Sequence, residues 1–192
     1  MKYKLIGIVI SVFIFSACSD SSTNVTENDK SSRAFYFNSF ESFEDTTGWL
    51  GLTKDTFVNE SMPDSGEFSI HLGGGCIQPA ASIEFDSPGE GRYKFSFLAK
   101  MGQPSQQAHL ILKSDAYQDE KDQLNVEVNT TDWKLYQSEG YLYVPAGKKI
   151  ILEIWVGGIV FADVYVDNLK IEKETVPQFA GDVYKSVLNL FK

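Results

Sequence analysis

The segment EFDSPGE, residues 84–90, carries three carboxylates within seven residues. Alternate residues of a β-strand share a face, and a retaining glycoside hydrolase needs an acid and a nucleophile about 5 to 5.5 Å apart. Glu84 and Asp86 have the spacing for such a pair. The Pro-Gly dipeptide that follows cannot continue a central strand, so Glu90 falls beyond a turn. We therefore interpret the segment as a strand end and a turn, without a catalytic role.

Other residue types that could do chemistry are equally poorly placed. His71 and His109 fall in expected strands and lack the HxH or HExxH spacing of a metal site, so we interpret them as strand histidines with ordinary partners. The GGGC run at 73–76 precedes neither a helix nor GK[ST], unlike a phosphate-binding loop. Cys76 would need a neighbouring base to act as a nucleophile, and the sequence places neither histidine to serve, although the fold decides what lies near it. We expect Cys76 to be a buried, inert thiol.

The elements that would position these residues are strands. From residue 34 to 173, short alternating runs are separated by turn residues, and no helical period persists. This pattern predicts an all-β fold, a two-sheet antiparallel β-sandwich over residues 34–174. The clearest expected strands cover 68–72, 81–85, 92–101, 108–113, 124–128, 133–136, 141–144, 150–156 and 160–171.

Two runs show how the strands should be oriented. In RYKFSFLAK, residues 92–100, aromatic and small apolar residues alternate with Lys and Ser, which predicts one face in the core and one in water. The apolar residues of the final run keep one phase up to Val166 and then switch phase at Leu169. A β-bulge at Asp167 and Asn168 would produce this switch and re-aim side chains near a site. A strand buried on both faces would give the same pattern.

The start of the chain, MKYKLIGIVISVFIFSAC, predicts export. A basic start and a short apolar run, shorter than the roughly 20 residues of a membrane-spanning helix, precede FSAC, which resembles the lipobox of bacterial lipoproteins. In such signals the peptide before the cysteine is removed and the cysteine is lipidated. In this chain, residues 1–17 would be removed and Cys18 would carry the lipid. An ordinary secretory signal cleaved near Ala17 is the alternative.

Residues 18–33 are rich in Ser, Thr, Asn and Asp and cannot bury enough apolar surface to offset the entropy of ordering, so we expect a flexible tether. Its start, CSDSS, resembles the acidic, serine-rich stretch that directs some lipoproteins of Bacteroidetes to the outer face of the outer membrane. The expected location is therefore the outer membrane of a Gram-negative bacterium, on the cell surface.

The charge of the chain limits its partners. Asp and Glu number 26 against 17 Lys and Arg, a formal net charge of −9. Such acidity leaves no footprint for a phosphate backbone, so nucleic acid is not expected as a partner. The residues beyond the tether are one domain on length.

The tail, residues 175–192, departs from the strand pattern. Phe179, Val183, Val187 and Phe191 recur every fourth residue, which predicts an amphipathic helix. The helix would either pack across the sandwich or dock a partner protein.

Five further segments occur in order along the chain: FEDTTGW (43–49), SGEFSIHL (65–72), YKFSFLAK (93–100), TTDWKLY (130–136) and VYVDNLKIEK (164–173). Together they resemble the galactose-binding-like jelly roll of carbohydrate-binding modules, especially families four, nine and twenty-two. The resemblance spans residues 35–173. It implies a β-sandwich with a structural calcium ion clamped between the first strand, the loop before SGEFS and the final strand.

Matched onto the family motif, the calcium ligands would be the carboxylates of Glu44, Asp64 and Asp167 and the carbonyls of Ser42 and Glu67. Ca²⁺ takes about six to eight oxygens and accepts both donor types, and three carboxylates would repel one another without a cation. Glu41 or Asp45 could replace Glu44. Ordinary solvated acids are the alternative reading.

Glycan binding would use aromatic rings that cover the C–H faces of sugars, with polar neighbours for the hydroxyls. Trp155 and Glu153 share one face of an expected strand and are the main candidates. Tyr141 and Tyr143 would join them if the strand register allows, and Tyr117 lies in a polar loop. By the family pattern, Trp49 and Trp133 are expected in the core.

The sequence therefore predicts a non-catalytic carbohydrate-binding module of a lipid-anchored extracytoplasmic protein. One alternative is a structural or adhesive surface lipoprotein that docks another envelope protein, which would present a broad apolar patch involving the tail helix. A third is a jelly-roll glycoside hydrolase, which would need two carboxylates facing each other in one cleft.

Overall fold

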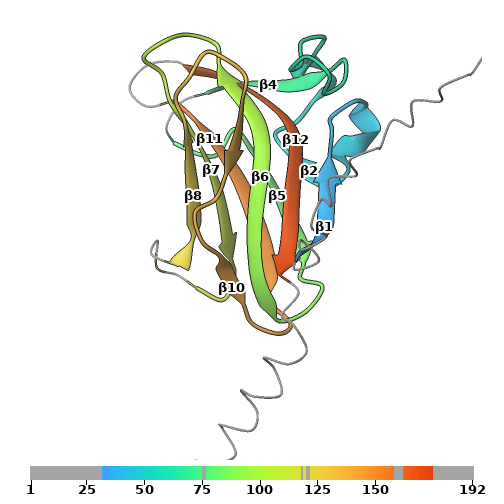
Figure 1. Cartoon of the computed structure of the whole chain (residues 1–192), viewed down its shortest axis with the longest axis vertical. Helices are drawn as coiled ribbons and strands as arrows, with labels where there is room; N and C mark the ends of the chain where they lie inside the picture. Colours follow the sequence, from blue (N-terminus) through green and yellow to red (C-terminus); the bar gives the residue numbers. More distant parts are fainter. Residues whose placement is uncertain (1–31, 75–76, 118, 120–121, 158–161, 175–192) are drawn as a thin grey trace, which may run out of the picture.

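The computed structural model describes residues 32–74, 77–117, 119, 122–157 and 162–174 (Figure 1). The predictions for the signal peptide, Cys18, Cys76 and the tail helix lie outside these residues. Within the described part, no helix has the length and apolarity needed to cross a membrane.

Two antiparallel sheets pack face to face, which confirms the predicted sandwich (Figure 1). The larger sheet has the order β10-β6-β12-β4-β3, with β1 paired to β12 and β9 paired to β6. Its strands are β1 Ser32–Asn38, β3 Phe57–Val58, β4 Ser69–Gly74, β6 Gly91–Met101, β9 Lys134–Gln137, β10 Leu142–Val144 and β12 Ala162–Glu174. The smaller sheet has the order β2-β5-β11-β7-β8. Its strands are β2 Trp49–Leu50, β5 Ala81–Asp86, β7 Ala108–Ser114, β8 Leu124–Val128 and β11 Lys149–Val156.

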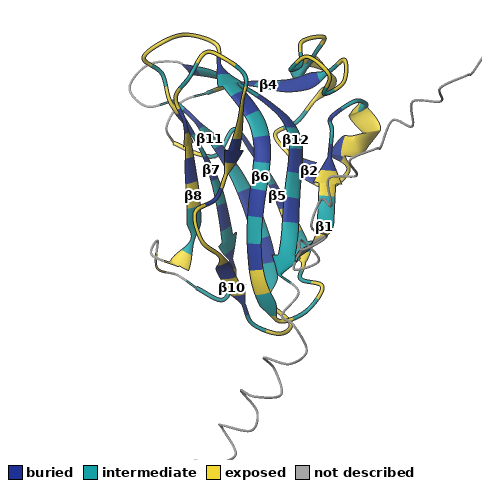
Figure 2. Ribbon diagram, viewed as in Figure 1, coloured by how far each residue is buried: buried dark blue, intermediate teal, exposed yellow. Residues whose placement is uncertain are grey.

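The core lies between the inner faces of the two sheets (Figure 2). On β6, Tyr93, Phe95, Phe97 and Ala99 are fully buried, and the residues between them are not, as the alternation predicted. The rings of Phe95 and Phe97 stack with centroids 5.7 Å apart. From the other sheet, β7 and β11 contribute Leu110, Leu112, Ile150, Leu152 and Ile154.

All nine predicted strands are present, with small shifts at their ends. Strands β1, β2 and β3 were not predicted from the sequence, and neither were two short 3₁₀ helices, η1 Phe43–Thr46 and η2 Lys54–Thr56. Strands β2 and β3 have two residues each, too few to show an alternating pattern. Strand β1 begins at Ser32, inside the segment predicted as a tether.

The predicted bulge in β12 is confirmed. The pairing of β12 with β6 shifts register between Asp167 and Lys170, and Asn168 adopts a left-handed conformation with φ of 47°. Because of the shift, Val166, Asp167 and Leu169 are all fully buried. The bulge thus turns a carboxylate inward and switches the apolar phase of the strand from Val166 to Leu169, as predicted.

One core prediction is wrong. Trp49 is buried as expected, but Trp133 is half-exposed on the outer face of the larger sheet. It directly precedes β9 at the edge of the sheet, where the Lys100 Nζ atom lies 5.6 Å from the centre of its ring. The ring of Tyr165 meets it edge-on at 6.4 Å. Trp133 therefore packs against outward-facing side chains of β6 and β12.

Candidate ligand-binding site

The outer face of the smaller sheet carries a groove of about 490 Å³, which we call the sheet groove. Strands β7 and β11 form its floor, and described residues between β7 and β8 form one wall. Its lining includes Ile111, Tyr117, Gln123, Ile151, Glu153 and Trp155. The groove thus combines two aromatic rings, an apolar floor and polar groups, the usual composition of a small-molecule or sugar site.

The floor follows from strand alternation and register. Glu153 and Trp155 point outward from β11, while Leu152 and Ile154 between and beside them are fully buried. Glu153 pairs across the sheet with Ile111 of β7. The outward side chains of the two strands therefore form one continuous surface.

Glu153 holds Trp155 in place. The indole Nε1 of Trp155 donates a hydrogen bond of 2.9 Å to Glu153 Oε2, and Lys113 Nζ lies 2.7 Å from Glu153 Oε1. Both carboxylate oxygens are therefore engaged, each with a different donor. These contacts order the ring of Trp155 before any ligand arrives, which lowers the entropic cost of binding.

Hydrogen bonds after β7 anchor the wall that carries Tyr117. The Tyr117 backbone N donates to the Ser114 carbonyl at 3.3 Å, and the Ala116 N donates to the Ser114 hydroxyl at 3.2 Å. Asp115 Oδ1 accepts a 2.7 Å hydrogen bond from the Lys149 backbone N at the start of β11. The turn is thereby tied to both strands of the floor.

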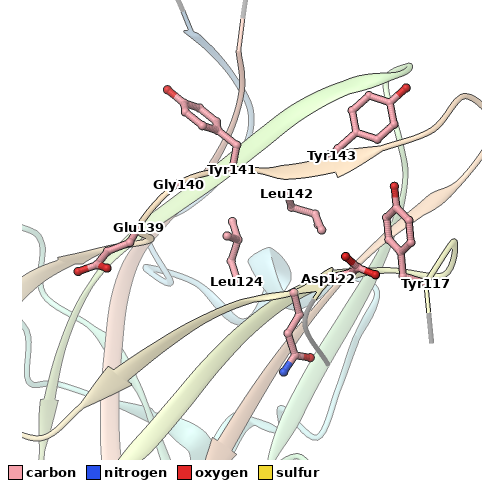
Figure 3. Close-up of a pocket in the computed structure, with 9 residues that line it drawn as sticks. Tyr117, Asp122, Leu124, Glu139, Gly140, Tyr141, Leu142 and Tyr143 are labelled. Atoms are coloured by element: carbon pink, nitrogen blue, oxygen red, sulfur yellow. The ribbon is translucent and has the colours of Figure 1, made fainter. Parts of the chain in front are cut away.

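A second groove of about 340 Å³, which we call the β10 groove, lies beside strand β10 (Figure 3). Leu124 and Leu142 point into the space between β8 and β10, with Tyr117 and Tyr143 at one end and Glu139 at the other (Figure 3). Tyr117, Asp122 and Gln123 line both grooves.

The predicted binding residues are therefore divided between the grooves. Trp155 and Glu153 line the sheet groove, Tyr141 and Tyr143 line the β10 groove, and Tyr117 stands at their junction. Their part in binding a glycan stays a prediction. The floor residue Ile111 was missed, because the sequence shows alternation within a strand but not which strand lies next to it.

The acidic segment at the end of β5 is a strand end and a turn, as predicted. Glu84 forms an ion pair with Lys149 on the outer face of the smaller sheet. Glu90 accepts a hydrogen bond from the hydroxyl of Tyr143 in the larger sheet. The two glutamates thus have separate partners in different sheets.

The histidines also have neighbours within the sheets. The ring of His71 stacks on that of Tyr165 at 4.6 Å, and its Nε2 lies 3.4 Å from Asp163 Oδ1. His109 Nδ1 lies 3.1 Å from Asn125 Oδ1. Within the described residues, no three His, Cys, Asp or Glu side chains are grouped to hold a metal ion.

Asp167 is the fully buried carboxylate of the β12 bulge. Its Oδ1 accepts a 2.6 Å hydrogen bond from the Asn168 backbone N, and its Oδ2 lies 2.9 Å from the Ser65 hydroxyl. Burial, opposed by these two hydrogen bonds and reinforced by the charge of Glu41, raises the pKa of Asp167 to about 6.

Glu41 is the carboxylate whose charge acts on Asp167. Its Oε2 accepts a 3.1 Å hydrogen bond from the Glu67 backbone N. Its Oε1 is buried and has no hydrogen-bond partner among the described residues. A Cβ atom at Gly66 would lie 1.8 Å from this Oε1, so glycine is needed there for Glu41 to enter.

The other predicted calcium ligands lie less deeply. The exposed carboxylate of Glu44 accepts a 2.7 Å hydrogen bond from the Ser42 hydroxyl, which, with a backbone hydrogen bond, lowers the pKa of Glu44. Asp64 is exposed, with a left-handed φ of 69°, and Glu67 is also exposed. Glu41, an alternative to Glu44 in the sequence analysis, is the carboxylate whose charge acts on Asp167.

No family model matches the sequence, and no curated protein matches it. Solved structures do match in fold. One is the family-22 module with the family-10 xylanase module of the Clostridium thermocellum endo-1,4-β-D-xylanase 10B, in complex with xylohexaose, at a TM-score of 0.52 and 21% identity. That match covers 72% of this chain and 28% of the xylanase chain. Another is the xylan-binding family-22 domain of a Paenibacillus barcinonensis protein, at a TM-score of 0.52 and 17% identity, covering 77% of this chain and 99% of that one.

The arrangement of the two sheets and these matches lead to one conclusion about architecture. This chain has the jelly-roll fold found in family-22 carbohydrate-binding modules, as the sequence analysis expected.

Proposed function

We propose that this protein is a non-catalytic glycan-binding module and that the sheet groove is its binding site. The observation that carries the proposal is the indole of Trp155, held by Glu153 at the edge of an apolar floor. An aromatic face covers the C–H face of a sugar ring, and nearby polar groups bond its hydroxyls. Two proteins with this fold, one in complex with xylohexaose and one a xylan-binding domain, support xylan-type chains as the first ligands to try.

Binding to a glycan array, followed by calorimetry on the full chain in detergent micelles, tests the proposal. Trp155→Ala should weaken binding at least about tenfold, or about 1.4 kcal/mol, because the stacking surface is lost. Trp133→Ala is the matched control, since that half-exposed tryptophan lies on the opposite sheet. A chain that binds no glycan, or binding that Trp155→Ala leaves unchanged, would refute the proposed site.

We also propose a structural calcium ion between Glu41, Asp167 and carbonyl oxygens of the loop before β4. The buried, unpartnered Oε1 of the half-buried Glu41 supports it, as does the raised pKa of the buried Asp167, because repulsion between their charges favours a cation. A bound ion would neutralise this pair and tie the N-terminal segment to the final strand.

The third part of the proposal is a lipid anchor at Cys18 that holds the module on the outer face of the outer membrane. Its support is the FSAC sequence after a basic start and a short apolar run. Cys18→Ala should abolish incorporation of labelled palmitate and move the protein from the membrane to the soluble fraction. Unchanged labelling would contradict the anchor.

A further inference from the structure

The β10 groove adjoins the sheet groove, because three residues line both. Tyr117, Asp122 and Gln123 form the wall that the two grooves share. The first groove lies on the smaller sheet and the second beside the β10 edge of the larger one. A ligand in the sheet groove therefore meets the β10 groove where it passes Tyr117.

The β10 groove is also suited to sugar rings. Leu124 and Leu142 give it an apolar floor (Figure 3), and the exposed rings of Tyr141 and Tyr143 stand on its rim. The two rings are ordered before binding. The guanidinium of Arg92 lies 4.3 Å from the centre of the Tyr141 ring, and the Tyr143 hydroxyl donates to Glu90.

Most of the charged residues that line the two grooves are acidic. Among the described residues that line them, Lys113 is the one cation, and it is paired with Glu153. Three exposed aspartates stand on the shared wall and beside it, and Glu139 adds a fourth exposed carboxylate at the far end of the β10 groove. The aspartates are Asp115, Asp119 and Asp122. These four groups would repel carboxylates on a ligand.

We propose that the two grooves form one extended site that binds an uncharged glycan chain along its length, with the β10 groove as a second subsite beyond Tyr117. This proposal rests on the proposed glycan-binding function. It adds the second subsite and the selection against carboxylated chains.

A chain-length series tests the second subsite. Xylobiose through xylohexaose are titrated by calorimetry, or the equivalent oligomers of whichever neutral polysaccharide binds best on the array. The wild-type affinity should rise with length. The double variant Tyr141→Ala/Tyr143→Ala should lose about tenfold in affinity for the longest oligomer and little for the shortest. Trp155→Ala should weaken all of them.

Leu135→Ala is the matched control, since Leu135 is 61% exposed on β9, away from both grooves. If the double variant binds every oligomer as the wild type does, the second subsite is refuted while the sheet groove stands. If Trp155→Ala also has no effect, or no glycan binds at all, the proposed function itself fails.

Arabinoxylan and glucuronoxylan share a backbone and differ in the charge of their side chains. They therefore test the proposed selection against carboxylated glycans. The neutral chain should bind more tightly at low salt, with the difference narrowing at high salt as the repulsion is screened. The double variant Asp122→Asn/Glu139→Gln should reduce the difference in affinity between the two polysaccharides at low salt as well. Equal or tighter binding of glucuronoxylan by the wild type at low salt would overturn the selection.

Discussion

The hydroxyl of Ser65 lies 2.9 Å from Oδ2 of Asp167, although 102 residues separate them in the chain. The same hydroxyl lies 2.6 Å from the Met62 carbonyl oxygen. A serine hydroxyl has one proton and cannot donate to both acceptors. If the Ser65 proton is donated to the Met62 carbonyl, the Ser65 and Asp167 oxygens repel each other. Either a proton on Asp167 or a bound cation would remove this repulsion.

The calcium proposal predicts a difference between two neighbouring glutamates. Calcium should stabilise the wild type by about 4 kcal/mol at millimolar concentration if the affinity is micromolar. Glu41→Gln should lose most of this increment, whereas Glu44→Gln should keep it, because the Glu44 carboxylate is exposed and bonded to Ser42. Thermal melts with calcium and with chelator measure the increment.

Asp167→Ala should also remove the calcium increment. The decisive sample is wild-type protein shown to be metal-free by elemental analysis. If its melting temperature is the same with added calcium as with chelator, there is no structural calcium site. Loss of the increment in Glu44→Gln but not in Glu41→Gln would restore the ligand assignment made from the sequence.

The metal-free protein should show a pH dependence of known sign. The pKa of Asp167 is raised from 3.8 to about 6 in the folded state, so between these values the folded state binds more protons than the unfolded state. The contribution of Asp167 to stability is therefore full below about pH 4 and lost as the pH rises through about 6, a change of about 3 kcal/mol.

Urea denaturation in chelator, at several pH values, measures this contribution as the difference between wild type and Asp167→Asn. Asparagine cannot titrate, so the variant should gain stability relative to the wild type as the pH rises from about 4 to 7. Titrating groups that do not interact with Asp167 cancel in the difference, whereas the interaction with the charge of Glu41 is part of the measured contribution. A constant difference across this range would show that Asp167 is ionised throughout.

The contact between Glu153 and Trp155 predicts how the binding surface depends on its support. Glu153→Gln keeps an oxygen that can accept from the indole, so glycan affinity should fall by less than about threefold. Glu153→Ala frees the indole and leaves Lys113 unpaired, and affinity should fall about tenfold. Calorimetry gives the affinities, and the indole N–H resonance of Trp155 reports the hydrogen bond. An equal loss in both variants would show that the charge, and not the orientation of the ring, matters.

The long strands could be predicted because their pattern is local. In β6, one outward-facing residue separates each buried ring from the next. This alternation can be recognised without knowing the partner strand. Strands β1 to β3 lack such a signal. They are short or lie at a sheet edge, and pairing with β12, β5 and β4, not their own sequence, makes them strands.

The same distinction applies to the candidate site. Trp155 and Glu153 were found together because they are two residues apart on one strand. Ile111 meets Glu153 through the register of β7 with β11, and Tyr117 reaches the same groove from the turn after β7; the sequence displays neither relationship. Glu41 was kept only as an alternative to Glu44, because the family motif aligns the segment but does not fix which carboxylate points inward.

The bulge at Asn168 connects the fold to the proposed calcium site and provides the last prediction. Asn168 has a φ of 47°, in a region that glycine and asparagine tolerate and that costs other residues about 1–2 kcal/mol. Its backbone N also donates to Asp167 Oδ1 at 2.6 Å. The left-handed residue thus sets the register shift and helps to hold the buried carboxylate.

Asn168→Gly should therefore change the free energy of unfolding by less than about 0.5 kcal/mol, because glycine adopts this φ freely and keeps the backbone donor. Asn168→Val should lower it by about 2 kcal/mol or more, because a β-branched side chain disfavours this conformation. It should also weaken the calcium increment by moving Asp167. Urea denaturation of both variants, with and without calcium, measures these effects. If valine is tolerated as well as glycine, β12 can pass Asp167 without the left-handed residue, and the bulge does not position the carboxylate.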